Sequence, residues 1–257
     1  MNKNRILFYF AWIIMSAFIL FSGCAGLNSR RPNCHDEKAL KLAESIKDFN
    51  KNINSCTGIG WIRVLRQGRI DKFRAAWAVL NHDKIRLTLM TGGFPVETII
   101  ADGRKVIFLS HTQRHSLYKI NSPNPSLADI LSIPVKVRDI ISLLSGQIPL
   151  KAFDYACLLK TVTPGKKTLM LHKKWSAGAQ QVIFDPDNII REYELFGSEE
   201  HLMYSVSFSY FNTRGVFQIP FKIIIRDSSG RSLSLEITGY RVNSPVKDSA
   251  FSLTESG

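Results

Sequence analysis

The apolar positions of this chain repeat with two different periods, and the change falls near residue 57. Between residues 36 and 54, Leu42, Ile46, Phe49 and Ile53 are spaced four, three and four apart. That spacing places them on one stripe of a helix, so an amphipathic helix is expected there. From residue 57 onward, apolar and polar residues alternate for most of the chain, which predicts strands with one buried face each.

The alternating segments predict a large antiparallel sheet of about 12 or 13 strands. The dipeptide Asp102-Gly103 between two of these segments favours a tight hairpin. The expected strands before residue 121 are 58–66, 72–79, 84–89, 96–101, 105–110 and 115–120, and those after residue 154 are 155–162, 168–173, 180–184, 189–196, 202–211, 216–225 and 232–241.

Two short helices interrupt the strand pattern in the middle of the chain. One begins at Pro125-Ser126, and the second follows Pro134 and carries Val137, Ile140, Ile141 and Leu144 on one face. A sheet of this size must curl, and its concave side is large enough to cover the apolar helix faces. The expected fold class is therefore α+β: a large curled antiparallel sheet forming a half-open β-barrel, with an N-terminal helix and two central helices as a lid.

The N-terminal residues have the layout of a secretory leader, which is removed from the mature protein. Lys3 and Arg5 precede the uncharged segment 6–21, which runs into Phe21-Ser22-Gly23-Cys24. These last four residues resemble the lipobox of bacterial lipoproteins. That resemblance implies that Cys24 becomes the acylated N-terminus and attaches the chain to membrane lipid.

The expected domains are a lipoprotein signal peptide (1–23), a lipidated tether (24–35) and a folded domain (36–257). An uncleaved membrane anchor is the alternative reading of segment 6–21. Sixteen residues in a helix reach ~24 Å, however, which is short of the ~30 Å hydrocarbon core of a bilayer.

The mature chain is strongly basic. Removal of residues 1–23 leaves 234 of the 257 residues and lowers the formal net charge from +13 to +11, because Lys3 and Arg5 are lost without any acidic residue. The basic residues are spread along the expected strands without a nucleic-acid-binding motif, so no nucleic-acid partner is expected. The charge suits a surface of anionic lipid head groups, where each basic side chain adds roughly 1 kcal/mol, although a merely well-solvated surface is the alternative.

Three cysteines remain once Cys24 is assigned to the lipid. The helix expected between Cys34 and Cys56 would separate them by ~27 Å, whereas a disulfide requires Cα atoms within ~7 Å. We therefore expect no bridge between this pair. Cys157 lies in a strand pattern and is expected to be a small buried apolar residue.

Enzyme chemistry has little support in the sequence. No glycine-rich phosphate loop, nucleophile elbow, zinc-binding spacing or acid-paired histidine is found. His111 and His115 flank an expected turn, and no third metal ligand lies nearby. The chain is therefore expected to be neither an enzyme nor a holder of a metal or cofactor.

Four loose motifs follow one another along the chain in an order that resembles the LolA/LolB lipoprotein-sorting carriers, most closely the lipid-anchored LolB type. The resemblance extends from about residue 36 to residue 253. It implies that a half-open barrel with a helical lid holds the acyl chains of lipoproteins away from water, without making or breaking a bond. The motifs are Ile85-Arg86-Leu87-Thr88-Leu89 ahead of Gly92-Gly93, the pair Asp102-Gly103, the run Leu144-Ser145-Gly146-Gln147-Ile148-Pro149, and Ile219-Pro220-Phe221-Lys222.

The same resemblance implies the partners and the location of the protein. Acylated lipoproteins or other amphiphiles would be its cargo, and a periplasmic carrier protein would be a further partner. Ala25 follows Cys24, in place of the Asp that marks retention at the inner membrane in enteric bacteria. We therefore expect a monomer, lipid-anchored at the periplasmic face of the outer membrane.

Alternation along the strands selects the side chains expected to line a lipid cavity. Binding an acyl chain in such a cavity needs no catalytic residue, because burial of each CH₂ group of the chain stabilises the complex by ~0.8 kcal/mol. Ordinary core packing is the alternative for every one of these side chains. They are Phe73, Trp77, Ile85, Leu87, Val206 and Phe208 on the strands, and Ile140 and Leu144 on the lid.

The segment Met90–Pro95 follows the third expected strand, where the LolB pattern has an exposed hydrophobic residue that touches the membrane. Phe94 occupies a comparable place, and Gly92 and Gly93 make the loop pliable. Gly92, Gly93 and Phe94 are therefore the expected membrane-contact loop. A Phe94 side chain that is tucked into the protein is the alternative.

Two other functions remain open from the sequence. One is a lipid-anchored structural or envelope-assembly protein whose barrel is filled by its own side chains, which predicts that no cavity exists. The other is a carrier of a different amphiphile, such as a glycolipid or a free fatty acid, which would use the same hollow sheet. The sequence does not choose between cargos.

Overall fold

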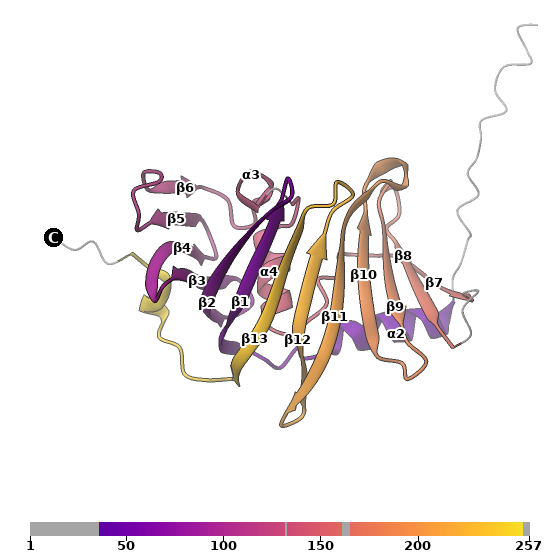
Figure 1. Ribbon diagram of the computed structural model, residues 1–257. Helices are drawn as coiled ribbons and strands as arrows, with labels where there is room; N and C mark the ends of the chain where they lie inside the picture. Colours follow the sequence, from indigo (N-terminus) through magenta and orange to yellow (C-terminus); the bar gives the residue numbers. More distant parts are fainter. Residues whose placement is uncertain (1–35, 132, 161–164, 254–257) are drawn as a thin grey trace, which may run out of the picture. The chain divides into compact units, whose positions relative to one another are not determined.

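The computed structural model describes residues 36–131, 133–160 and 165–253, and in these residues 13 strands form one antiparallel sheet (Figure 1). Their order across the sheet is β6-β5-β4-β3-β2-β1-β13-β12-β11-β10-β9-β8-β7. The pair β1 and β13 therefore lies in the middle, while β6 and β7 form two separate edges. The sheet is not closed, so the predicted α+β class with a curled, half-open barrel is confirmed.

Each predicted strand has a counterpart in the sheet, with ends that shift by a few residues. Of the segment 115–120, Tyr118–Ile120 is a strand, and residues 161–162 of another predicted strand lie outside the described part of the chain. The strands are β1 (Ser55–Arg66), β2 (Arg69–Leu80), β3 (Lys84–Thr91), β4 (Phe94–Asp102), β5 (Val106–Ser110), β6 (Tyr118–Ile120), β7 (Tyr155–Lys160), β8 (Lys167–His172), β9 (Ala179–Phe184), β10 (Ile190–Phe196), β11 (Leu202–Arg214), β12 (Phe217–Arg226) and β13 (Ser232–Val242). The helices are α2 (Glu37–Asp48), α3 (Ala128–Leu131) and α4 (Val137–Leu144), with 3-10 turns η1 (Ser198–Glu200) and η2 (Asp248–Phe251).

Alternating burial along the strands gives the sheet one apolar concave face. Trp77 and Val79 of β2 are buried and stand opposite Leu87 and Ile85 of β3. The register between strands shifts at several points, among them Ile59/Gly60 in the β1–β13 pair. Such bulges bend a strand and increase its twist, which helps a sheet of this size to curl.

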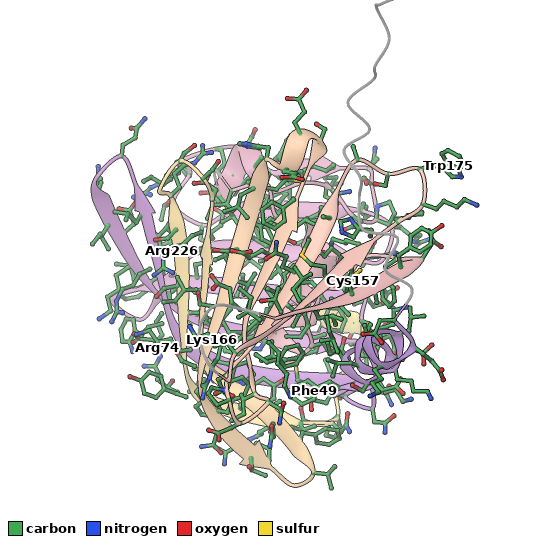
Figure 2. All side chains as sticks on the ribbon, turned by 90° about the vertical axis from the view of Figure 1, so that its right-hand side faces the viewer. Phe49, Arg74, Cys157, Lys166, Trp175 and Arg226 are labelled. Carbon is green, nitrogen blue, oxygen red and sulfur yellow. The ribbon has the colours of Figure 1, made fainter. Side chains whose placement is uncertain are left out.

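Helix α2 is shorter than the predicted span of residues 36–54. Asp36 caps its start by accepting a hydrogen bond from the backbone N–H of Lys38 at 2.9 Å, and the helix ends at Phe49, whose backbone is extended. Figure 2 looks along the axis of α2 and shows Phe49 beside it. The prediction was wrong beyond residue 48 because Asn50 adopts a positive φ and turns its side chain toward distant backbone carbonyls.

The stripe that α2 buries also differs from the predicted one. Ala39, Ala43 and Ile46 are its buried residues, and the helix lies against β7, where the Asp36 N–H donates to the Ala156 carbonyl at 3.4 Å. Small alanine side chains allow a close approach to the strand. Ile46 belongs to both stripes, whereas Leu42 and Phe49 of the predicted stripe are half-buried.

The segment 121–154 joins the two edge strands β6 and β7 and carries α3 and α4. Figure 1 shows α4 behind β1 and β13, on the concave side of the sheet. Val137, Ile141 and Leu143 of α4 are buried in the same core cluster as the inward residues of the strands. The central helices therefore form the predicted lid.

A buried carboxylate holds α4 against the far half of the sheet. Asp139, 3 % exposed, accepts a hydrogen bond from the Tyr204 hydroxyl of β11 at 2.9 Å and forms an ion pair with the Lys151 ammonium. The Lys136 N–H also donates to Asp139, at 3.3 Å. Burial, with the negative charge of Asp139 as a further cause, raises the pKa of Tyr204, so its phenol keeps the proton that it donates.

A second polar contact extends this connection to β9. Gln180 of β9 exchanges two hydrogen bonds with the backbone of Lys151: the Lys151 N–H donates to its Oε1 at 2.7 Å, and its Nε2 donates to the Lys151 carbonyl at 3.2 Å. The buried Tyr193 hydroxyl of β10 also donates to Gln180. Side chains from three strands thus fix the segment that follows α4.

The C-terminal end of α4 is held by side chains from β1, from β13 and from the turn that follows α2. The Tyr240 hydroxyl of β13 donates to the Leu144 carbonyl at 2.7 Å, and the Cys56 thiol of β1 donates to the same oxygen at 3.4 Å. Asn50 donates to the Gly146 carbonyl at 2.7 Å. These bonds satisfy carbonyls that a helix end leaves without an internal partner.

We expect the substitution Asp139→Ala to lower the free energy of unfolding by about 3 kcal/mol, because it leaves the Tyr204 hydroxyl and the Lys151 ammonium without their buried acceptor. Urea denaturation followed by circular dichroism measures this loss. The matched control is Glu44→Ala on the exposed face of α2, which should change the free energy of unfolding by no more than about 0.5 kcal/mol. An Asp139→Ala loss no larger than that of the control would contradict the anchoring role.

Candidate functional site

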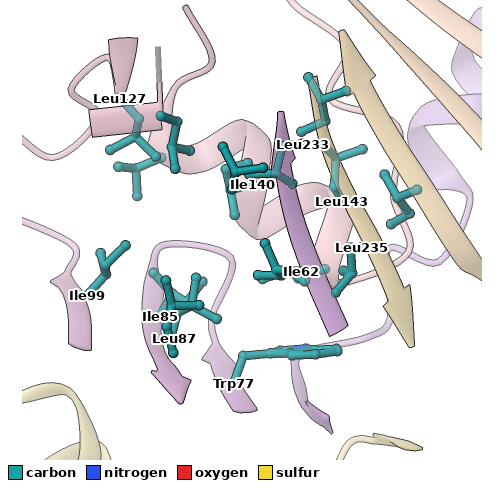
Figure 3. Close-up of a pocket in the computed structure, with 17 residues that line it drawn as sticks. Ile62, Trp77, Ile85, Leu87, Ile99, Leu127, Ile140, Leu143, Leu233 and Leu235 are labelled. Carbon is teal, nitrogen blue, oxygen red and sulfur yellow. The ribbon is translucent and has the colours of Figure 1, made fainter. Parts of the chain in front are cut away.

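An apolar cavity lies between the lid and the concave face of the sheet (Figure 3). Its volume is about 80 Å³. Its walls are hydrocarbon side chains and one indole, so water inside it would find almost no hydrogen-bond partner. The lining residues are Ile62, Val64, Trp77, Ile85, Leu87, Leu89, Ile99, Leu127, Leu131, Val137, Ile140, Leu143, Leu144, Ile223, Ile225, Leu233 and Leu235.

The residues predicted to line a lipid cavity fall into three groups. Trp77, Ile85 and Leu87 from the sheet and Ile140 and Leu144 from the lid line the cavity. Figure 3 shows Trp77 and Ile140 on opposite sides of it. Contact of any of these side chains with a lipid stays a prediction.

The remaining three predicted residues lie elsewhere. Phe73 is half-buried in a separate groove, while Val206 and Phe208 of β11 are buried in the core without lining the cavity. Strand β11 lies three positions from β1 in the sheet order. Its inward side chains therefore pack in the half of the molecule where Asp139 of α4 bonds to Tyr204 of β11.

One whole wall of the cavity was missed by the sequence analysis. Ile223 and Ile225 of β12 and Leu233 and Leu235 of β13 alternate clearly in the sequence. Nothing in the alternation shows, however, that the last two strands return to pair beside β1 in the middle of the sheet. The pairing of β1 with β13 brings these four side chains under the lid.

The cavity is small for a lipid site. Ligand pockets usually occupy about 300–1,000 Å³, several times the volume found here. Lid side chains such as Val137 and Leu143 pack in the same core cluster as the inward residues of the strands. A ligand of the usual size would therefore fit this cavity only if part of the lid moved.

Trp77 is placed by a glycine on the neighbouring strand. A Cβ atom on Gly58 of β1 would lie 2.1 Å from a ring carbon of Trp77, so any larger residue would displace the indole. The buried Trp77 N–H has no hydrogen-bond partner among the described residues. This N–H is buried and the surface of the cavity is apolar throughout, so it is an unpaired donor within the core.

A larger groove of about 530 Å³ adjoins the cavity and shares Leu89 with it. Phe73, Leu89 and Phe108 form part of its apolar surface, and Ile130 reaches it from α3. Charged side chains stand at its rim; they are Arg66, Glu97, Arg114 and His115. We call this feature the rim groove.

His115 and Glu97 form an ion pair at the rim, with 3.0 Å between the histidine Nε2 and a carboxylate oxygen. The Ser116 carbonyl and the Glu97 carboxylate raise the pKa of His115, because both stabilise its protonated form. His111 instead contacts Thr98 at 2.9 Å. Among the described residues no group of three or more His, Cys, Asp or Glu side chains is placed to hold a metal ion.

The predicted membrane-contact loop is the hairpin between β3 and β4. Gly92 and Gly93 both have positive φ, as a two-residue turn of this kind requires, and Phe94 is 77 % exposed. The side chain is therefore not tucked into the protein. A second exposed aromatic residue, Trp175 in the β8–β9 hairpin, was not singled out from the sequence; it is 94 % exposed and projects away from the sheet (Figure 2).

The predicted leader, the lipidated Cys24, the tether and Cys34 lie outside the described residues. Cys56 and Cys157 are both buried, as a small apolar residue would be. Burial raises the pKa of the Cys56 thiol to about 11. Among the described helices, none is long and apolar enough to cross a bilayer.

Several solved structures share this architecture. A LolA superfamily protein from Nitrosomonas europaea matches with a TM-score of 0.59 and 14 % identity, over 84 % of this chain and 97 % of that one. A domain from Vibrio parahaemolyticus, described as an outer membrane lipoprotein-sorting protein domain, matches with a TM-score of 0.59 and 12 % identity, over 84 % and 96 % of the two chains. A DUF1329 family protein from Desulfovibrio piger has a TM-score of 0.59 and 9 % identity, over 84 % and 96 %.

No protein-family model and no curated protein matches the sequence. At identities this low, a structural match speaks for the fold and leaves the ligand open. The resemblance inferred from the sequence motifs is confirmed at that level. With its half-open antiparallel barrel and helical lid, the chain has the fold of the LolA superfamily.

Proposed function

We propose that this protein is a lipid-anchored carrier of the LolB type, which shields the acyl chains of lipoproteins and helps to place them in the outer membrane. The observation that carries the proposal is the apolar cavity under the lid of a LolA-like barrel, with walls from the sheet, α3 and α4. No catalytic group is required, because such a carrier binds and releases its cargo without changing a bond. The protein would act as a monomer.

Burial of acyl chains supplies the driving force for opening the lid. Each buried CH₂ contributes ~0.8 kcal/mol, so one chain with about 14 methylenes contributes ~11 kcal/mol before costs. Opening exposes some apolar lid surface, which an entering chain then covers again. A small cavity in the absence of cargo is therefore compatible with carriage.

The two lid helices differ in how they are held, and we infer that α3 is the part that moves. Helix α4 is fastened through Asp139 and Leu144 to strands on both halves of the sheet. The α3 segment is held by bonds to nearby chain, such as the Leu127 N–H to the Val135 carbonyl at 2.8 Å and the Arg138 N–H to Asn124 at 3.0 Å. Displacement of α3 would join the cavity to the rim groove.

Two other functions use the same fold. A structural or envelope-assembly lipoprotein would keep the lid closed permanently, and the small cavity volume favours this candidate. A carrier of a different amphiphile would open in the same way as a lipoprotein carrier. Uptake of an acyl probe distinguishes the first alternative from both carriers.

Uptake can be followed through Trp77, since it lies in the cavity wall. In the Cys24→Ser protein, the added substitutions Trp61→Phe and Trp175→Phe leave Trp77 as the reporter in the mature chain. Titration with a long-chain fatty acid brominated along its tail should quench the emission of Trp77. Mass spectrometry of the purified protein should also find bound lipid.

Two controls make this test specific. The companion protein with Trp61→Phe and Trp77→Phe keeps the exposed Trp175 and should show no saturable quenching. Filling the cavity with Val64→Phe should weaken uptake by about tenfold or more, equivalent to ~1.4 kcal/mol. Absence of both quenching and co-purified lipid would replace the carrier by the scaffold alternative.

The lipid anchor is tested by Cys24→Ser. Without acylation the chain should leave the membrane fraction after cell lysis, because removal of the leader leaves no other attachment. The measurement is fractionation followed by immunoblotting, with the wild-type chain alongside. If Cys24→Ser partitions with membranes as the wild type does, segment 6–21 is an uncleaved anchor.

The exposed hairpin is tested by Phe94→Glu. We expect slower transfer of bound acyl cargo to liposomes, because a carboxylate resists insertion among lipid head groups, and an unchanged free energy of unfolding. The matched control is Val216→Glu in the β11–β12 hairpin, which is 90 % exposed and lies at the opposite strand end. Equal transfer rates for Phe94→Glu and the wild type would remove this loop from the mechanism.

A further inference from the structure

The rim groove has a volume and a surface that the cavity lacks. At about 530 Å³ it falls in the usual range for small-molecule sites. Phe108 is buried and its ring lies 5.9 Å from that of Tyr118, so the aromatic part of the groove is a packed surface. The groove can therefore receive an acyl chain in the conformation that the structure shows.

The charged groups of the rim leave an excess of positive charge. Glu97 is already engaged by His115, which is the nearest basic partner of its carboxylate. Arg66 contacts Asp71 at 3.4 Å, and that carboxylate is shared with Arg69 at the same distance. The guanidinium groups of Arg66 and Arg69 thus share the single carboxylate of Asp71, beside the part of the groove that Arg66 lines.

Arg114 is the basic group of the rim with unused hydrogen-bonding capacity. Its backbone N–H donates to the Ser110 hydroxyl at 3.3 Å. Its guanidinium has no hydrogen-bond or ion-pair partner in the part of the chain that the structure describes. A guanidinium binds carboxylate or phosphate oxygens in a two-pronged geometry, so an anion is the ligand that it fits.

The groove continues toward the lipid cavity at two places. Leu89 belongs to both linings, and α3 presents Ile130 to the groove and Leu131 to the cavity. A tail that lies along Phe73 and Leu89 would reach the cavity once α3 moves. The charged rim would then stand at the polar end of that path.

We propose that the rim groove binds the anionic head group of a long-chain amphiphile, with Arg114 and Arg66 on the head group and the tail directed past Leu89 toward the cavity. This inference rests on the proposed carrier function and narrows its cargo. An acylated amphiphile with a carboxylate or phosphate head is favoured over one with an uncharged head. The free energy gained from the charged head group would add to that of burying the tail, which is the same for any head group.

The test compares dodecanoate with dodecanol, which share a chain length and differ in head-group charge. Each is used to displace an uncharged fluorescent acyl ester from the mature Cys24→Ser protein, residues 24–257. We expect dodecanoate to bind about tenfold more tightly than dodecanol at low salt. The preference should shrink as ionic strength rises, because the rim is exposed to solvent.

The variant that carries the test is Arg66→Gln combined with Arg114→Gln. It should abolish the preference for dodecanoate and leave dodecanol binding within about twofold of the wild type, since the apolar groove is unchanged. Arg114→Lys should retain part of the preference. The control is Arg104→Gln, an exposed arginine in the β4–β5 turn outside the groove, which should retain all of it.

The outcomes separate this inference from the function on which it rests. If both ligands bind and the wild type does not prefer the acid, or the preference survives the double substitution, the head-group site is wrong and the carrier function stands. If neither ligand displaces the probe, the carrier function fails and the head-group site fails with it. Circular dichroism of each variant shows that the fold is retained.

Discussion

The structure depends most on one buried carboxylate. Asp139 lies on the short helix that crosses the concave face, and it joins that helix to β11 through Tyr204 and to the following segment through Lys151. A charge with so little exposure is tolerated because each of its oxygens has a donor. Without this connection, α4 would be held only by its apolar packing and by the hydrogen bonds at its C-terminal end.

A fixed α4 divides the space inside the barrel. On the β7–β11 side, the Asp139 and Gln180 contacts close the interior, and Val206 and Phe208 pack there as core. On the β1–β3 side, the lid leaves the small apolar cavity and, beyond Leu89, the rim groove. Under the proposed carrier function, binding would be confined to the half of the barrel that α3 covers, where the hydrogen bonds that restrain α3 run to residues nearby in the chain.

This division makes the small cavity compatible with the proposed carrier function. A large permanent hollow would expose the apolar face of the sheet to water, at a cost that grows with its area. Side chains of the lid cover that face when no ligand is present. In the proposed carrier, the exchange of lid side chains for acyl chains would keep this apolar area in contact with hydrocarbon in both states.

Local patterns in the sequence determined the elements of the fold, since the period-two alternation of segments such as 72–79 and 84–89 follows directly from one buried face per strand. They also indicated Trp77, Ile85, Leu87, Ile140 and Leu144, which line the cavity. Tertiary structure decided the rest. The end of α2 at Phe49, the return of β12 and β13 to the middle of the sheet, and the closure around Asp139 all arise from contacts between residues far apart in the chain. Periodicity reports which face of an element is buried, whereas the partner of that face, and the volume left between them, are properties of the assembled packing.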